Sequence, residues 1–155
     1  MPRQRPLLWA WIAIASLNAP PQAAADPGSP TAAESLVVQV SNIPNDKGQI
    51  GCSLYADKNG FPSDPKMALQ SLFVTSKDGK ATCTFKEVKP GRYAVSVMHD
   101  ENKDGELETS IVGRPKEWWG VSNNVPPERF GPPKYGAAAF DIGAERKTIR
   151  VKLRL

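Results

Sequence analysis

Residues 88–108 read VKPGRYAVSVMHDENKDGELE, and this stretch decides the fold. Pro90-Gly91 predicts a tight turn, because proline presets φ at the first corner and glycine accepts a positive φ at the second. The residues after the turn alternate with a period of two, as in a half-buried strand. One face carries Tyr93, Val95, Val97 and His99, and the other carries Ala94, Ser96, Met98 and Asp100. The stretch therefore predicts a β-strand over 92–99 that runs into a loop rich in side-chain oxygens.

Other short segments show the same alternation and are separated by turn residues. We expect strands at 36–41, 49–56, 71–76, 81–85 and 147–155. Helical periodicity is almost absent, and only 67–69 has room for a helical turn. Short alternating strands with turn punctuation predict an all-β, antiparallel β-sandwich in a single domain.

The first 25 residues have the pattern of a signal peptide. Arg3 and Arg5 precede an apolar run at 7–17, and Ala23, Ala24 and Ala25 form a small-residue cleavage site. The alternative, a transmembrane anchor, needs a longer run to cross a hydrocarbon core of roughly 30 Å. We therefore expect a signal peptide at 1–25, a flexible tether at 26–35 and a domain at 36–155, with a periplasmic or secreted location and no membrane span in the mature chain.

Charge suggests no polyanionic partner. Loss of Arg3 and Arg5 with the leader lowers the formal charge from +4 to +2. The basic residues form no run interleaved with aromatics, so we expect neither nucleic acid nor an anionic membrane surface as a partner.

The two cysteines lie in predicted strands, on the faces that carry apolar residues. In an oxidising compartment, Cys52 and Cys83 are expected to pair across the core, and the alternative is two separate buried thiols. Their spacing is unlike the Cys-x-x-Cys of redox-active pairs.

Five short motifs follow one another along the chain. They are FKEVKPGRYAV at 85–95, HDEN at 99–102, GRPKE at 113–117, GVSN at 120–123 and GPP at 131–133. In these motifs, residues 36–155 resemble the bacterial exported family catalogued as domain of unknown function 2141. The resemblance implies a transthyretin-like, or prealbumin-like, Ig-like β-sandwich, and it implies no activity. Trp118-Trp119 and the two cysteines depart from the family's pattern.

The loop after the predicted strand raises the question of a metal. Its candidate ligands are Asp100, Asn102, Asp104, Glu108 and the backbone carbonyl of Glu106, at the spacing of a calcium loop with Gly105 at the sharp turn. The bidentate Glu at position twelve is replaced by Ile111, which predicts weak binding unless Glu117 or a distant residue completes the shell. The alternative is a solvated hairpin whose Asp and Asn side chains cap their own backbone.

The segment 111–135 is the second candidate site. Its glycines and prolines predict a long irregular loop, and loops of this length in a compact domain are usually functional or disordered. Trp118 and Trp119 either cover an open edge of the sandwich or form a stacking surface for sugars, peptides or another protein. Ser122 and Asn123 supply hydrogen-bonding groups for the loop backbone or for a ligand.

His99 is the only histidine and lies at the end of the predicted strand. It is either a ligand or acid–base group beside Asp100, or a histidine that is hydrogen-bonded at the rim of the sandwich. We assign no catalytic residues, because one histidine supports no Ser-His-Asp set.

These observations predict an exported binding or accessory module of the cell envelope rather than an enzyme. Calcium is the only suggested cofactor, and the expected partners are an envelope protein, a peptide or a glycan. The ligand-binding candidates are His99, Glu117, Trp118, Trp119, Ser122 and Asn123. The alternative is a hydrolase-like periplasmic enzyme that uses Glu117, Asp100 and His99 near the long loop.

Overall fold

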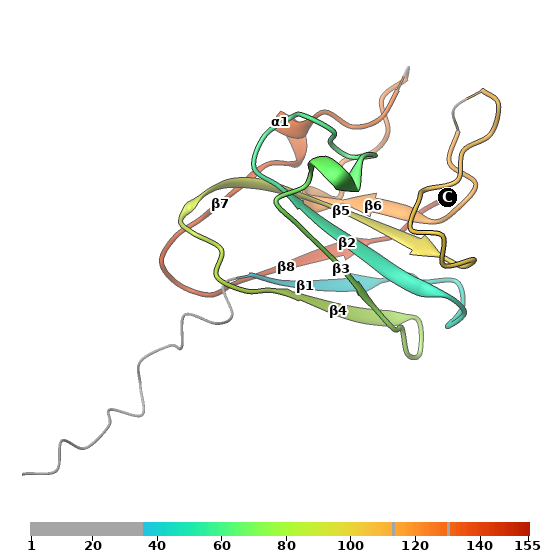
Figure 1. Ribbon diagram of the computed structural model, residues 1–155, viewed down its shortest axis with the longest axis horizontal. Coiled ribbons are helices and arrows are strands. Elements are labelled where there is room, and N and C mark those ends of the chain that lie inside the picture. The colour runs from blue at the N-terminus through green and yellow to red at the C-terminus, as the bar shows by residue number, and fades with distance from the viewer. Residues whose placement is uncertain (1–35, 113, 130) are drawn as a thin grey trace, which may run out of the picture.

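The computed structural model describes residues 36–112, 114–129 and 131–155. The predicted signal peptide at 1–25 and tether at 26–35 lie outside the described residues. The strands form two layers that pack face to face (Figure 1), which confirms the predicted all-β sandwich.

Eight strands and three short helices make up the regular structure of the described residues. The elements are β1 Leu36–Ser41, β2 Gln49–Tyr55, η1 Pro65–Met67, β3 Gln70–Val74, β4 Lys80–Phe85, β5 Gly91–Asp100, β6 Trp119–Val121, η2 Ser122–Asn124, α1 Tyr135–Ala138, β7 Phe140–Ile142 and β8 Lys147–Lys152. The three-stranded sheet has the order β4-β1-β8, and the five-stranded sheet has the order β3-β2-β5-β6, with β7 also paired to β5. All pairs between these strands are antiparallel except β1 with β8, which is parallel.

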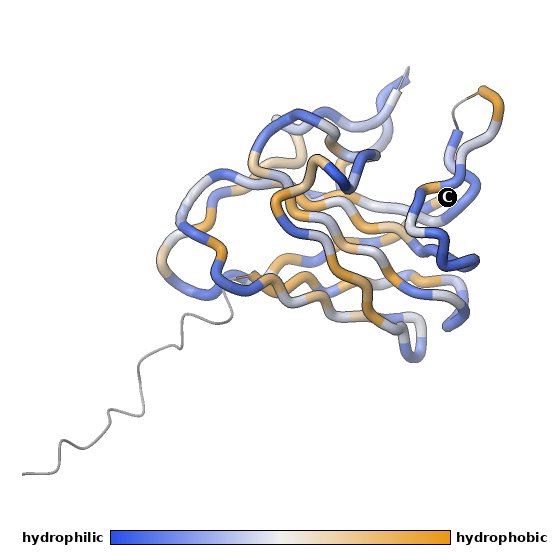
Figure 2. Tube along the Cα trace, in the orientation of Figure 1, coloured by the Kyte–Doolittle hydropathy of each residue, from blue (hydrophilic) through white to orange (hydrophobic). Residues whose placement is uncertain are grey.

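The main core lies between the two sheets, where the apolar faces of the strands meet (Figure 2). The face of β5 that carries Tyr93, Val95 and Val97 points into it, since these residues belong to the core cluster. Removal of these side chains from water is the main term that favours folding, at about 25 cal/mol per Å² of apolar surface.

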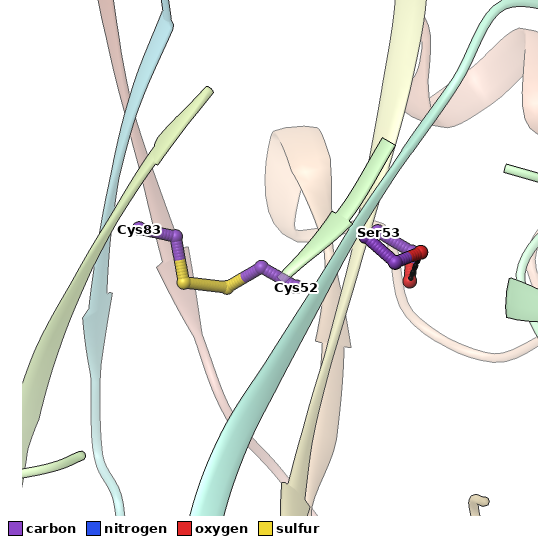
Figure 3. Close-up of a disulfide and its surroundings, with 4 residues drawn as sticks. Cys52, Ser53 and Cys83 are labelled. Atoms are coloured by element: carbon purple, nitrogen blue, oxygen red, sulfur yellow. Dashed lines mark hydrogen bonds between the residues drawn. A yellow bond between two sulfur atoms is a disulfide. The ribbon is translucent and has the colours of Figure 1, made fainter. Parts of the chain in front are cut away.

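A disulfide links the two sheets. Cys52 in β2 is bonded to Cys83 in β4, and both residues are fully buried, which confirms the predicted pairing. Figure 3 shows the side chain of Cys52 pointing toward Cys83, while the next residue, Ser53, points to the other side of β2. This alternation places Cys52 in the core and Ser53 on the outer face of the five-stranded sheet.

A second apolar cluster covers part of that outer face. Ala94, Trp119, Val121 and Ala138 are buried there, and Phe61 and Tyr135 pack against them. Figure 1 shows α1 above this sheet. The outer face of the five-stranded sheet is therefore covered in this part, so Ala94 and Val121 are as buried as residues of the main core.

The turn before β5 differs from the prediction. Gly91 is the first residue of β5 and pairs with Ile142, and its φ is not positive. The positive φ before this strand belongs to Glu87, at 55°. The predicted role of Gly91 at the second corner is wrong because the chain is already extended there.

None of the helices in the described part of the chain is long and apolar enough to cross a membrane.

Candidate functional site

The acidic loop, residues 100–108, begins at the last residue of β5. Asp100 is fully buried, and its Oδ2 accepts hydrogen bonds from Gln49 Nε2 at 2.8 Å and from the Gly105 N–H at 3.0 Å. Its Oδ1 accepts from the Asp104 N–H at 3.2 Å. Asp100 therefore fixes the turn in which Gly105 takes a φ of 79°.

Asn102 brings two carboxylates of the acidic loop together. Its Nδ2 donates to Asp104 Oδ2 at 2.8 Å and to Glu108 Oε1 at 3.1 Å. The Asn102 Oδ1 accepts from the Asp104 N–H, and Asp104 Oδ1 accepts from the Glu106 N–H. These are the side-chain-to-backbone bonds expected of the capped hairpin, and they bring together the side chains of the calcium prediction.

Glu117 joins the acidic loop from the residues that precede β6. Its Oε1 accepts from the Glu101 N–H at 3.3 Å and its Oε2 from the Glu108 N–H at 3.1 Å. Burial raises the pKa of the Glu117 carboxyl, and the negative charges of Asp100 and Asp104 raise it further, against the lowering effect of the two N–H donors. Glu117 thus lies beside the predicted ligands and is hydrogen-bonded to the backbone of the acidic loop.

The carboxylates of the acidic loop do not form a ready coordination shell. In the part of the chain that the structure describes, no group of three or more His, Cys, Asp or Glu side chains is arranged to hold a metal ion. The oxygens of Asp100, Asp104 and Glu117 face N–H donors instead. Calcium binding at this loop stays a prediction.

His99 is fully buried at the end of β5. Its Nε2 lies 2.8 Å from the Lys47 carbonyl oxygen, and its Nδ1 lies 3.7 Å from Glu101 Oε1 without a hydrogen-bond partner. Because a carbonyl oxygen only accepts, the Nε2 atom is the donor in the contact with Lys47. His99 points away from its neighbour Asp100, as the alternation of a strand requires.

The two tryptophans lie on opposite faces of the sheet. Trp118 is half-buried and packs against the main core, whereas Trp119 is 7% exposed and belongs to the cluster on the outer face. Because one ring packs against the main core and the other lies in the cluster on the outer face, the pair forms no common stacking surface. Both rings cover apolar parts of the sandwich, as in the first alternative for this pair.

Ser122 and Asn123 hold the chain after β6 against its neighbours. The buried Ser122 Oγ accepts from the Val95 N–H at 2.9 Å and donates to the Ala138 carbonyl at 2.6 Å. Asn123 Nδ2 donates to the carbonyls of Ala137 and Ala139, each at 3.1 Å. Both residues therefore supply hydrogen bonds to the protein's own backbone.

The carboxylate pair of the hydrolase alternative is enclosed. Asp100 is fully buried and Glu117 is 9% exposed, and each accepts hydrogen bonds from two backbone N–H groups. A general acid or base must reach the proton that it transfers. The oxygens of these two carboxylates are hydrogen-bonded to the backbone of the acidic loop and are not directed at a site that a substrate could occupy.

Two further residues hold the loops at this end of the sandwich: Gln49 supports the acidic loop, and Asp46 supports the turn between β3 and β4. Gln49 pairs with Asp100 across β2 and β5 and donates to its carboxylate. Asp46 accepts from the N–H groups of Asp78 and Gly79, and the Asp78 bond is the main cause of the lowered pKa of the Asp46 carboxyl. Only the strand register could have placed Gln49 there, and no local motif marks it.

Comparison with known proteins identifies one family. Its description is "Uncharacterized protein conserved in bacteria (DUF2141)", and it matches residues 38–150. No curated protein and no solved structure matches the chain significantly.

Proposed function

The chain belongs to the bacterial family DUF2141, and we propose that it is an exported binding or accessory module of the cell envelope whose acidic loop takes up a calcium ion. The disulfide between Cys52 and Cys83 supports export, because such bonds persist in oxidising compartments. The proposed ligand of the module is a peptide, a glycan or an envelope protein.

The observation that carries the calcium proposal is the position of Glu117. This carboxylate is brought against the acidic loop, and burial and the neighbouring charges of Asp100 and Asp104 raise its pKa. Carboxylates crowded in this way repel one another, and a divalent cation among them would offset that repulsion. Ile111, at position twelve of the motif, has no side-chain oxygen, and Glu117 is the carboxylate that replaces the missing ligand in this proposal.

In this proposal the ion is held by oxygens alone, as calcium prefers. The ligands are the side chains of Asp100, Asn102, Asp104, Glu108 and Glu117, with the backbone carbonyl of Glu106. Asn102 now directs its Nδ2 at Asp104 and Glu108, so its amide must turn over to present oxygen to the cation. This rearrangement, and the loss of bonds to backbone N–H groups, place the expected Kd at about 10⁻⁴ to 10⁻³ M.

Thermal unfolding with chelator and with millimolar calcium tests the proposal. A cation that binds only the folded state stabilises it by RT ln(1 + [L]/Kd), which is about 1.4 kcal/mol at tenfold excess over Kd. We expect the melting temperature to rise by a few degrees. The shift should disappear in Asp104→Ala, which removes a central ligand.

Glu106→Gln is the matched control, because only the backbone carbonyl of Glu106 is a proposed ligand. This variant should keep the calcium shift. If the hairpin only caps its own backbone, the parent's transition should ignore calcium, and Asp104→Ala should lose about 1 kcal/mol of stability in chelator as its turn-capping bonds disappear. A parent protein whose melting temperature does not change with calcium would contradict the proposed calcium site.

A further inference from the structure

A surface pocket of about 390 Å³ lies between the connection that follows β2 and the segment that leads into α1. Its lining includes Lys58, Phe61, Pro132, Pro133, Lys134 and Tyr135. This volume is within the range of small-molecule sites, which are mostly apolar with a few polar groups that orient the ligand. None of these residues belongs to the acidic loop, so the pocket is a separate site.

The aromatic walls of the pocket are fixed by contacts beneath them. The Tyr135 hydroxyl donates to the Arg92 carbonyl at 2.9 Å and lies 3.0 Å from the Ala56 carbonyl oxygen. The Phe61 ring packs edge-to-face against Tyr135, with centroids 5.8 Å apart, and against Tyr55, with centroids 5.3 Å apart. Rings held in this way lose little further freedom when a ligand binds, so the pocket is preformed.

The charges at the pocket favour an anion. Lys58 and Lys134 line it, and no acidic side chain does so among the described residues. The Lys134 ammonium lies 3.3 Å from Glu128 Oε2, and the side chains are 78% and 41% exposed, respectively. An exposed ion pair of this kind is weak, so an incoming carboxylate can compete with Glu128 for the lysine.

We propose that this pocket binds a small organic acid, a carboxylate carried on a flat ring. The ring lies against Phe61, Tyr135 and the two prolines, and the carboxylate lies between the ammonium groups of Lys58 and Lys134. The prolines and aromatic rings present apolar surfaces to the ring of the ligand, while the two cations select its charge. The inference goes beyond the calcium proposal and does not depend on it.

Two probes of the same shape distinguish the contribution of the ring to binding from the contribution of the carboxylate charge. 2-Naphthoate and 2-naphthamide are each titrated into the purified protein, and binding is followed at the backbone amides of Lys134 and Gly136 by NMR. Because both lysines are solvent-exposed, we expect naphthoate to bind about threefold to tenfold more tightly than naphthamide at low ionic strength. This preference should shrink as salt rises to about 0.5 M.

Paired variants assign that preference to the pocket lysines. The Lys58→Gln/Lys134→Gln double variant should lose it and still bind naphthamide as the parent does. Lys80→Gln is the control, because Lys80 is exposed on β4, in the other sheet, and this variant should keep the preference.

Three results would overturn the proposal. They are equal affinity of the parent for both probes, no response of the Lys134 and Gly136 amides to either probe, and a loss of preference in Lys80→Gln as large as in the double variant. Calcium and chelator should leave all these titrations unchanged, so failure of the acidic loop to bind calcium is distinguishable from failure of this site.

Discussion

The Glu117 carboxylate accepts a hydrogen bond from the backbone N–H of Glu108, nine residues earlier in the chain, at 3.1 Å. Its second oxygen accepts from the Glu101 N–H, so one side chain ties both ends of the acidic loop. The same carboxylate has a raised pKa, with burial as the main cause. Glu117 therefore organises the loop and adds to its electrostatic cost when ionised.

We expect Glu117→Gln to change the pH dependence of stability. A carboxyl whose pKa is higher in the folded state holds its proton there after the unfolded chain has lost it. The contribution of Glu117 to the free energy of unfolding of the parent should therefore fall as pH rises from about 4.5, the ordinary pKa of a glutamate, to the folded pKa. The amide of the substituted side chain does not titrate, so this decline should be absent from the variant.

Urea unfolding of both proteins between about pH 4 and pH 8 measures the difference. The exposed Glu106 supplies the control, since Glu106→Gln should follow the parent across this range. A constant difference in stability between the parent and Glu117→Gln over the whole range would contradict the prediction.

The disulfide predicts a large loss of stability when both cysteines are replaced. Cys52 and Cys83 join β2 to β4 across the core and close a loop with a sequence separation of 31. Cys52→Ala/Cys83→Ala should lose roughly 3 to 4 kcal/mol on the chain-entropy model, measured by urea unfolding. The parent should show no free thiol by mass spectrometry until it is unfolded and reduced, because the two sulfurs are bonded to each other and are buried away from a reductant. A variant as stable as the parent would show that the bond adds nothing.

The longer strands could be predicted from sequence because their alternation is local. Residues 36–41 form β1 at the predicted bounds, and the predicted strand over 92–99 is β5 with one residue added at each end. β6 and β7 could not be predicted in this way, since each has only three residues and depends on pairing with β5. The parallel pairing of β1 with β8 likewise joins distant segments that carry no local signal.

The candidate site shows the same division between local and distant contacts. Spacing alone identified Asp100, Asn102 and Asp104 as one group, and hydrogen bonds connect them. The position of Glu117 depends on the hairpin in which the Lys116 N–H donates to the Glu108 carbonyl, and the sequence offered Glu117 only as one possible completing ligand. Ser122 could not be assigned to Val95 without the β5–β6 register.

Ser122→Ala should destabilise the protein by about 1 to 3 kcal/mol. The substitution leaves the buried Val95 N–H and Ala138 carbonyl without this partner, and unpaired buried polar groups are costly. Ser63, which is exposed in the connection after β2, supplies a matched control, and Ser63→Ala should stay within about 0.5 kcal/mol of the parent. Equal urea midpoints for the two variants would show that the Ser122 hydroxyl has no structural role.

Gly120→Ala should also destabilise the protein, for a steric reason. A Cβ at Gly120 in β6 would lie 2.9 Å from the Lys152 carbonyl oxygen and 2.9 Å from Val151 Cγ1. Because the carbonyl belongs to β8, the methyl group could fit only if β6 and β8 moved apart, and overpacking of this kind typically costs about 1 to 3 kcal/mol.

Gly136 in α1 provides the opposite case, since a Cβ there meets nothing within 4 Å. Alanine is favoured over glycine by up to about 1 kcal/mol in a helix, so Gly136→Ala should equal or exceed the parent in stability. The melting temperature of Gly120→Ala should therefore fall below that of the parent, and that of Gly136→Ala should stay equal or rise. A Gly120→Ala protein that melts at the same temperature as the parent would show that β6 does not pack against β8 this closely.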